Sequence, residues 1–461
     1  LEIYDLTLTV NAADNGINGK DSHLIDSAAI TVTCGGDAIR STNDTDTTLG
    51  WIRISNSTLT LTAGEDGIQA ETALTMSSGS YTITSGGGSS VQPSDETSAK
   101  GIKAGSSLTL LSGVYTLDCS DDAIHSNGDV SVSGGVYTIS TGDDAFHADE
   151  ALAVAGGEID ILTSYEGLEG STVEVSGGTI SVVSSDDGVN AAGGTDASGF
   201  GGFGGGNTFG GASSDYDITI SGGYLVVKAG GDGLDSNGSI TMSGGTVLVS
   251  STGNADGALD YETSFTLSGG TLFAVDSGNM GATPSQASQY TVCIGFGTAL
   301  SAGTYVALEG ENQNFVFQLP IAGLSMVFSS PELESGAVYT VSYGGEYSGE
   351  TVDGIGSGGS YSGGTELTEL TLSDYLTTYG SLGMGGMPGG NMGGRPGGMG
   401  GAPSGEMGNM PSGEMGDPPD GDMGGRANGG MDRRSGGDMG GWTGSSTNES
   451  SDPSSAAQET A

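Results

Sequence analysis

A short phrase recurs every 22 residues through the middle of this chain. It reads AKGIKA, DDAIHS, DDAFHA, YEGLEG and DDGVNA, and its small residue falls at Gly101, Ala123, Ala145, Gly167 and Gly188. Related phrases flank this run as DNGING, GDAIRS, EDGIQA, GDGLDS and DGALDY, so at least ten copies are visible. A unit this short cannot bury its own apolar face, and each copy must therefore be one rung of a stacked array.

A second phrase follows the first by about ten residues in most rungs. VSVSGGVYTIS, VEVSGGTISV and ITMSGGTVLV alternate apolar with polar residues and are interrupted by Ser-Gly-Gly. This pattern is typical of strand, tight corner and strand. Three short strands per rung predict an all-β fold, a right-handed parallel β-helix of about 22 residues per rung. Leucine-rich repeats would need several Leu at LxxLxL spacing, and the calcium β-roll has the wrong period.

Equivalent residues should stack about 4.8 Å apart along such an array. The residue after the small one is apolar in every copy, which predicts a core column: Ile17, Ile39, Ile68, Ile102, Ile124, Phe146, Leu168, Val189, Leu234 and Leu259. The position two after Gly-Gly forms a second column: Tyr81, Tyr115, Tyr137, Ile159, Ile180, Leu225, Val247 and Leu272. Because it mixes Tyr with aliphatic residues, we favour an interior ladder over an aromatic sugar platform.

The residue before the small one is the most informative, and we call this the acid column. It runs Asn15, Asp37, Asp66, Lys100, Asp122, Asp144, Glu166, Asp187 and Asp232, and several rungs add a preceding acid such as Asp121. Like charges one rung apart repel by roughly 3 kcal/mol per pair at an effective dielectric near 20. The sequence pattern predicts that no cationic side chain offsets the seven carboxylates from Asp121 to Asp187. Lys100 continues the column as a built-in cation.

Oxygen ligands at flexible spacing suit Ca²⁺. We therefore predict a calcium site or sites among the acids of this region: Glu65, Asp66, Asp121, Asp122, Asp143, Asp144, Glu166, Asp186, Asp187, Asp232 and Asp235. The alternative is a solvated acidic edge with weak, nonspecific cation affinity. The position three after the acid column, here called the late column, supplies predicted ligand-contacting residues: Lys103, His125, His147, Glu169 and Asn190. The two histidines are alternatively an exposed polar ladder.

Charge limits the partners of this chain. Residues 1–383 carry 47 Asp and Glu against 6 Lys and Arg, a net charge of −41. Such a surface repels nucleic acid and anionic membranes, and no apolar run is long enough to span a membrane. The acidic, Lys-poor composition, rich in Thr, Ser and Gly, favours an extracellular location on a bacterial cell surface.

Three regions are expected. Residues 1–280 hold the rungs, residues 281–379 contain ordinary strand-like runs of a small β-rich region, and residues 380–461 are a Gly/Met/Pro/Ser-rich tail that cannot form a core. A Gly-rich excursion at 193–214 interrupts the rungs, with Phe200, Phe203 and Phe209 along it. It is either a glycan-gripping loop or a disordered one.

The rungs, the DD-small-apolar turns, the Ser-Gly-Gly corners and the Gly/Met/Pro tail resemble the bacterial calcium-binding parallel β-helix proteins of the carbohydrate-binding-domain family. That family is similar in structure to the pectate lyases, and the resemblance covers roughly residues 1–345. It implies calcium-dependent, non-catalytic binding of polygalacturonate or cellulose-like glycans at the cell surface. The lyase pattern DD-Gly-apolar-Asp is incomplete here, because the paired-acid rungs end in His125, His147 and Asn190.

Two other functions stay open. One is a structural or adhesive surface protein, and the other is a polysaccharide lyase that uses calcium and a Lys base, Lys100 or Lys103. Acidic neighbours stabilise the ammonium form of a lysine, which opposes the role of base. Replacing both Asp122 and Asp144 with Asn is expected to preserve the shape of a calcium-bridging protein and to remove most of its retention on pectate.

Overall fold

The computed structural model describes residues 1–92, 97–192, 215–278 and 280–382 of the 461-residue chain. The Gly-rich excursion at 193–214 and the predicted tail, apart from residues 380–382, lie outside the described residues. The described residues form 40 β-strands and no helix, so none offers a helix that could cross a membrane. They all fall in one compact unit, and 32 of the strands join one large, mostly parallel sheet. The all-β prediction is confirmed.

The strands of the rungs fall into three columns. The first, which begins after the acid column, holds β3 (Ile17–Gly19), β6 (Ile39–Ser41), β8 (Ile68–Ala70), β10 (Ile102–Ala104), β13 (Ile124–Ser126), the starts of β16 (Phe146–Val154) and β18 (Leu168–Val175), then β20 (Val189–Ala191), β23 (Leu234–Ser236) and β26 (Leu259–Tyr261). The second holds β1 (Glu2–Tyr4), β4 (Ser22–Asp26), the first parts of β7 (Trp51–Ala63) and β9 (Ala73–Ser85), β11 (Ser107–Leu110), β14 (Asp129–Val132), the ends of β16 and β18, β21 (Asp217–Ile220), β24 (Ser239–Met242), β27 (Ser264–Leu267) and β29 (Gln286–Ala287). The third holds β2 (Thr7–Asn11), β5 (Ala29–Thr33), the ends of β7 and β9, β12 (Val114–Cys119), β15 (Val136–Thr141), β17 (Glu158–Ser164), β19 (Thr179–Ser184), β22 (Tyr224–Ala229), β25 (Thr246–Ser251) and β28 (Thr271–Asp276).

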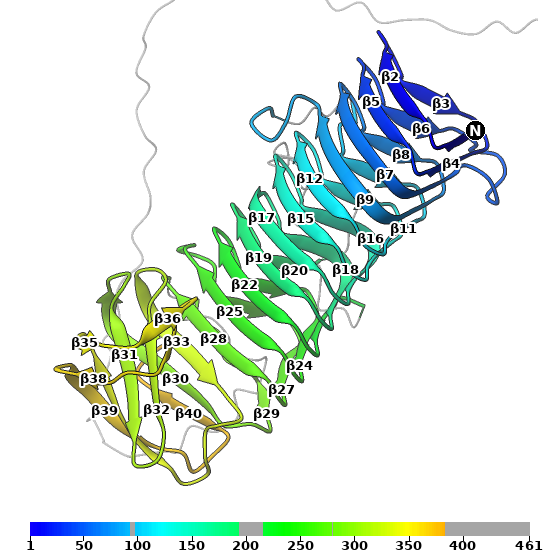
Figure 1. The fold of residues 1–461 in the computed structure, drawn as a ribbon. Coiled ribbons are helices and arrows are strands. Elements are labelled where there is room, and N and C mark those ends of the chain that lie inside the picture. The colour runs from blue at the N-terminus through cyan, green and yellow to red at the C-terminus, as the bar shows by residue number, and fades with distance from the viewer. Residues whose placement is uncertain (93–96, 193–214, 279, 383–461) are drawn as a thin grey trace, which may run out of the picture. The chain divides into compact units, whose positions relative to one another are not determined.

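Each strand pairs in parallel with its equivalent in the next rung, as Figure 1 shows along the labelled strands. Ile102 lies opposite Ile124, and Ile124 opposite Phe146, so the register between rungs equals the sequence period. Tyr115 lies opposite both Tyr81 and Tyr137 and is fully buried. Both predicted core columns are therefore interior ladders, and the aromatic sugar platform is wrong for the tyrosine column.

The Ser-Gly-Gly corners turn the second strand of a rung into the third. Their second glycine has a positive φ, for example +120° at Gly135 and +78° at Gly245. A side chain would be strained in that region of backbone space. A Cβ on Gly245 would also lie 2.6 Å from the carbonyl oxygen of Gly222 in the preceding corner, so stacking excludes a larger residue there.

The C-terminal residues cover the last rung. β33 (Gly323–Ser329) pairs antiparallel with β28 and with β30 (Thr291–Leu300), and β30 pairs with β40 (Leu376–Tyr379). This pairing occupies the edge that the final parallel strand would otherwise leave open. A six-stranded antiparallel sheet follows, from β31 (Tyr305–Gly310), β32 (Asn314–Gln318), β34 (Val338–Tyr343), β36 (Glu350–Val352), β37 (Ile355–Ser357) and β39 (Thr365–Thr371), beside the pair β35 (Glu346–Tyr347) and β38 (Tyr361–Ser362).

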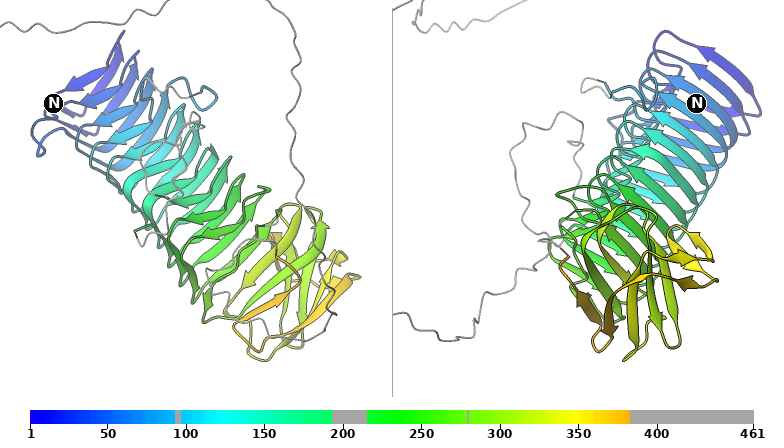
Figure 2. Two further views of the ribbon diagram at one scale, coloured as in Figure 1. Left: turned by 180° about the vertical axis from the view of Figure 1, so that it is seen from behind. Right: turned by 90° about the vertical axis from the view of Figure 1, so that its left-hand side faces the viewer.

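Two hydrophobic cores result from this arrangement. One runs through the interior of the rungs, and the other joins the outward face of β22, β25 and β28 to the C-terminal strands through residues such as Val226, Leu248 and Phe273. Figure 2 shows both parts from two further directions, with the C-terminal strands in yellow. The boundaries at residues 280 and 379 stay predictions.

Candidate functional site

The acid column lies at the turn that leads into the first strand of each rung. The late column lies three residues further on, inside that strand. Successive late-column residues are direct neighbours across the parallel pairs, in the order Lys103, His125, His147, Glu169, Asn190 and Asp235. Two polar columns therefore run side by side, and the rungs align charges that are distant in sequence.

Carboxylates of the acid column bind the backbone of the next rung. Asp122 Oδ1 accepts a hydrogen bond from the N–H of Asp144 at 3.1 Å, and Asp144 Oδ1 accepts one from Glu166 at 3.0 Å. The same bond links Asp37 to Asp66, Asp66 to Lys100 and Asp187 to Asp232. A buried N–H without a partner would be costly, so these acids have a structural role whether or not they bind a cation.

Lys100 compensates part of the acid column. Its Nζ lies 2.8 Å from Asp121 Oδ1 and 2.6 Å from Asp122 Oδ2, and all three residues are buried. The expectation that the acids from Asp121 onward have no cationic partner is therefore wrong, whereas Lys100 is the built-in cation that was expected. Burial opposes ionisation of Asp122, yet Lys100 and His125 outweigh it and hold the pKa of this carboxyl well below its usual range.

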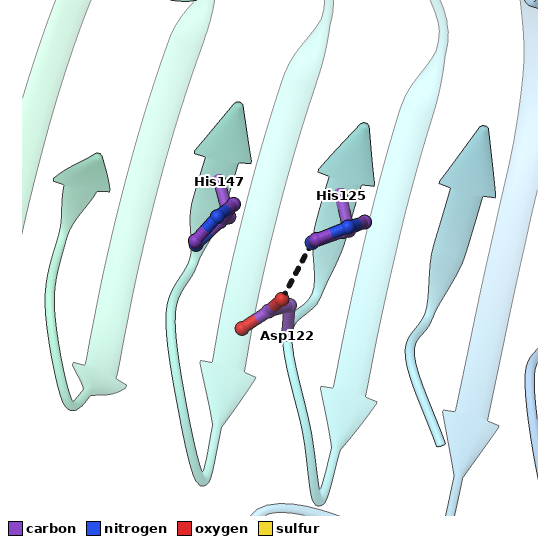
Figure 3. A group of neighbouring side chains, drawn as sticks. All are labelled: Asp122, His125 and His147. Carbon is purple, nitrogen blue, oxygen red and sulfur yellow. Dashed lines mark hydrogen bonds and ion pairs between the residues drawn. The ribbon is translucent and has the colours of Figure 1, made fainter. Parts of the chain in front are cut away.

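The two histidines form a buried pair. His125 Nδ1 lies 2.8 Å from Asp122 Oδ2, and His147 Nδ1 lies 3.1 Å from Asp144 Oδ2. Their rings stack with centroids 4.8 Å apart on successive strands, as Figure 3 shows with Asp122. At 1% and 0% exposure they are not the exposed polar ladder of the alternative interpretation. Burial lowers the pKa of His147, but the hydrogen bond to Asp144 and the close carboxylate of Glu169 outweigh it and raise the pKa to about 12.

Beyond Glu169 the acids that the structure describes in the two polar columns are less buried and have no basic partner. Asp187, Asp232 and Asp235 bring carboxylate oxygens within 4.8 Å of one another and are only half-buried. Within the described part of the chain, no Lys, Arg or His forms an ion pair with them. Burial and neighbouring carboxylates raise the pKa of Asp187 and Asp232 to about 8 and that of Asp235 to about 7. Three converging oxygens without a protein cation fit a hard divalent ion such as Ca²⁺.

Most of the other predicted metal ligands have hydrogen-bond or ion-pair partners within the protein, and two lie outside any converging group of acids. Asp66 accepts hydrogen bonds from Ser98 and from the N–H of Lys100, and its Oδ2 lies 4.0 Å from Lys103 Nζ. Three further groups converge within 4.8 Å: Asp121, Asp122 and Asp143; Asp122, His125 and His147; and Asp144, His147 and Glu169. Glu166 is buried and accepts a hydrogen bond from Asn190 at 2.8 Å. Glu65 and Asp186 are half-buried and belong to none of these groups.

The sequence interpretation missed three acids around the columns. Asp149 Oδ1 lies 3.3 Å from His147 Nε2, and Asp256 and Asp260 contribute to the raised pKa of Asp232. Asp256 and Asp260 stand in the phrase DGALDY, where the period itself points to them. Asp149 has Asn127 and Ser171 as its equivalents in the neighbouring rungs, so no run of acids marks this position in the sequence.

A cleft of about 380 Å³ lies away from these columns, on the outward face of β22, β25 and β28. Val226, Leu248 and Phe273 line it together with Pro320 and Lys228. No pattern in the sequence pointed to it, because its two walls come from the rungs and from the C-terminal sheet.

Stability is expected to depend on pH and calcium through Asp187, Asp232 and Asp235. Their folded-state pKa values lie above the unfolded value of about 4, so the folded protein binds more protons and its stability falls as pH rises through about 7 to 8. Melting temperatures in EDTA should therefore decrease from pH 5 to pH 9. Millimolar calcium should remove most of that decrease. A melting temperature indifferent to calcium at pH 8.5 would contradict this expectation.

Comparison with known proteins gives one match. Residues 1–145 match a family model described as "Carbohydrate-binding domain-containing protein". No curated protein and no solved structure matches the chain. The similarity supports carbohydrate binding. The matched residues include Lys100, Asp122 and His125, and they end before His147 and the group formed by Asp187, Asp232 and Asp235.

Proposed function

We propose that this protein is a secreted, non-catalytic, calcium-dependent carbohydrate-binding protein of the bacterial cell surface, built as a right-handed parallel β-helix. Its ligand is an acidic polysaccharide of the polygalacturonate type. One observation carries the proposal: Asp187, Asp232 and Asp235 gather three half-buried carboxylates at a place where the columns have lost their own cations. The family-model match supports the carbohydrate part of the proposal.

A shared cation explains how such a protein can hold an acidic sugar. Residues 1–383 carry a net charge of −41 and should repel polygalacturonate. Calcium accepts six to eight oxygen ligands, so a site of three carboxylates leaves positions for the carboxylate and hydroxyl groups of a glycan. The partial exposure of the three acids gives the glycan access to the ion.

The tyrosine column supports the same mode of binding. Tyr81, Tyr115 and Tyr137 stack on one another inside the rungs, and their hydroxyl groups donate to backbone carbonyls. These rings are closed to a sugar, so stacking of sugar on this column does not contribute to affinity. We therefore rank the acidic glycan above the cellulose-like one.

The absence of catalysis is part of the proposal. Lys100 is buried between Asp121 and Asp122, and Lys103 Nζ donates to Ser98 at 3.0 Å and lies near Asp66. Neither arrangement presents a free amine to a substrate. Incubation with pectate and calcium should therefore produce no absorbance from unsaturated uronides, and uronide release that disappears on replacement of Lys103 with Ala would establish the lyase instead.

The double variant Asp232→Asn and Asp235→Asn tests the site. It should keep its β-rich circular dichroism and lose most calcium-dependent retention on a pectate column, because two of the three oxygen ligands are weakened. Asp122 and Asp144 are unsuited to this test, since they are fully buried and bonded to histidine or lysine. Asp232 is half-buried, and an Asn oxygen can still accept its hydrogen bond from the N–H of Gly257. Replacement of Asp122 and Asp144 is not expected to preserve the shape, contrary to the sequence-based expectation.

Glu158→Gln with Asp160→Asn is the matched control. Both residues are exposed on β17, and the change in charge is the same. The control should bind pectate in calcium as the unmodified protein does. An equal loss of pectate retention in both variants would show that net charge, and not the site, determines binding. Retention of pectate in EDTA would exclude a bridging cation. A glycan array that shows no calcium-dependent ligand would favour the structural or adhesive role.

A further inference from the structure

His147 lies among more acceptors than its protons can serve. Its Nδ1 lies 3.1 Å from Asp144 Oδ2 and 2.5 Å from Glu169 Oε2, and all three side chains are buried. One ring N–H donates one well-directed hydrogen bond, which goes to Asp144. Glu169 Oε2 accepts no hydrogen bond despite the short contact. A ring nitrogen and two carboxylate oxygens that converge with one donor among them, and leave one buried oxygen without a hydrogen bond, are expected around a cation that binds them all.

The second ring nitrogen of His147 lies near a further carboxylate. Its Nε2 is 3.3 Å from Asp149 Oδ1, although neither atom forms a hydrogen bond as the two side chains lie here. A histidine that binds a metal through one nitrogen usually donates its other N–H to a carboxylate, which fixes the tautomer and strengthens the ligand. On the next rung, Asn190 Oδ1 is buried without a hydrogen-bond partner, and Asn190 lies directly opposite Glu169.

The excess of buried negative charge also favours a bound cation at this position. Asp144, Glu166 and Glu169 are three buried carboxylic groups within two rungs. The ammonium group of Lys100 lies with Asp121 and Asp122 instead, and His147 as an imidazolium would supply one positive charge. A divalent ion supplies two and needs the ring neutral at Nδ1.

We propose that Asp144, His147 and Glu169 bind a divalent first-row transition ion such as Zn²⁺ at the first strand column, separately from the calcium-binding acids. Zn²⁺ binds imidazole nitrogen and carboxylate oxygen at about 2.0–2.2 Å, and buried sites of this kind stabilise a fold. Imidazole in the ligand set favours zinc, copper, iron or nickel over calcium. The proposal does not depend on glycan binding.

The test uses the full chain without a polyhistidine tag. The protein is unfolded in EDTA, refolded with zinc, manganese or calcium, freed of excess metal by gel filtration and analysed for metal content. Zinc refolding should give about one tightly held zinc per chain. Refolding with Co²⁺ should give visible absorption bands, because cobalt reports nitrogen and oxygen ligation by its d–d spectrum.

His147→Gln and Glu169→Gln should each lower zinc affinity at least tenfold, since even outer-shell changes cost about 10- to 100-fold. His23→Gln is the matched control, because His23 is the other fully buried histidine outside this pair and bonds a backbone carbonyl. It should keep both zinc and the cobalt spectrum, as should Asp235→Asn. Three results would overturn the site: His147→Gln holds zinc as tightly as the unmodified protein, equimolar calcium displaces the zinc, or no zinc is retained after refolding. His147 would then be an imidazolium paired with the two carboxylates.

Discussion

Replacing Lys100 with Met is expected to lower the free energy of unfolding by about 3–5 kcal/mol, the cost of breaking a buried ion pair on one side only. The side chain of Lys100 is 4% exposed and its ammonium group contacts two carboxylates, one of which is completely buried. Met retains the apolar stem of the side chain but leaves Asp121 and Asp122 without their cation. Urea unfolding followed by circular dichroism, in EDTA and in calcium, measures the change.

Lys103→Met is the control for that change. Lys103 lies three residues after Lys100 in the same rung, but its side chain is 22% exposed and its Nζ is 4.0 Å from Asp66. A partly solvated pair at that distance contributes about 1 kcal/mol or less. Equal losses in the two variants would show that burial of the Lys100 pair has no special weight. Partial recovery of stability in Lys100→Met combined with Asp122→Asn would identify the uncompensated charge as the cause.

Replacing Tyr115 with Ala is expected to cost about 3–5 kcal/mol, because it opens a cavity in the interior of the rungs. The Tyr115 ring stacks on Tyr137 at a centroid distance of 4.5 Å and an angle of 5°, and it also contacts Tyr81. Its hydroxyl group donates to the carbonyl of Ser112 at 3.0 Å, so truncation also removes a buried hydrogen bond. Thermal and urea unfolding measure the loss.

Tyr115→Leu separates the cavity from the aromatic contact. Leu occupies the same column at Leu225 and Leu272, where the rung geometry is unchanged. We expect Tyr115→Leu to lose about half as much as the Ala variant. A Leu variant as unstable as Ala would show that stacking between rings, rather than filled volume, holds this part of the column.

The arrangement of cations along the rungs connects the structural and binding roles of the acids. Lys100 and the histidines lie beside the acids up to Glu169, whereas Asp187, Asp232 and Asp235 have no Lys, Arg or His in an ion pair among the described residues. The same backbone-capping bonds continue in both halves, for example from Asp187 to Asp232. The acids that cap the backbone in every such rung thus form a candidate ion site where no described basic side chain neutralises them.

The sequence by itself determined the repeat, the strands and the interior columns. Parallel pairing at an offset of 22 residues in the central rungs makes the sequence period equal to the structural register, so Ile124, Tyr115 and Asp122 were assigned correctly to columns by counting. The glycine corners followed for the same reason, since each rung needs the same positive φ at the same place. The Lys100 position was also correctly read as an internal cation, because it replaces an acid within its column.

Only the tertiary structure decided how the acids are compensated. Counting gives the column of a residue but not the direction of its side chain, so contacts that cross columns, such as Lys100 with Asp121 and Glu169 with His147, could not be seen. Burial of both histidines depends on the strands stacked above and below them, which a single phrase does not contain. The half-buried group of Asp187, Asp232 and Asp235 is formed by residues on two rungs that 45 residues of chain separate, and stacking alone brings their oxygens together.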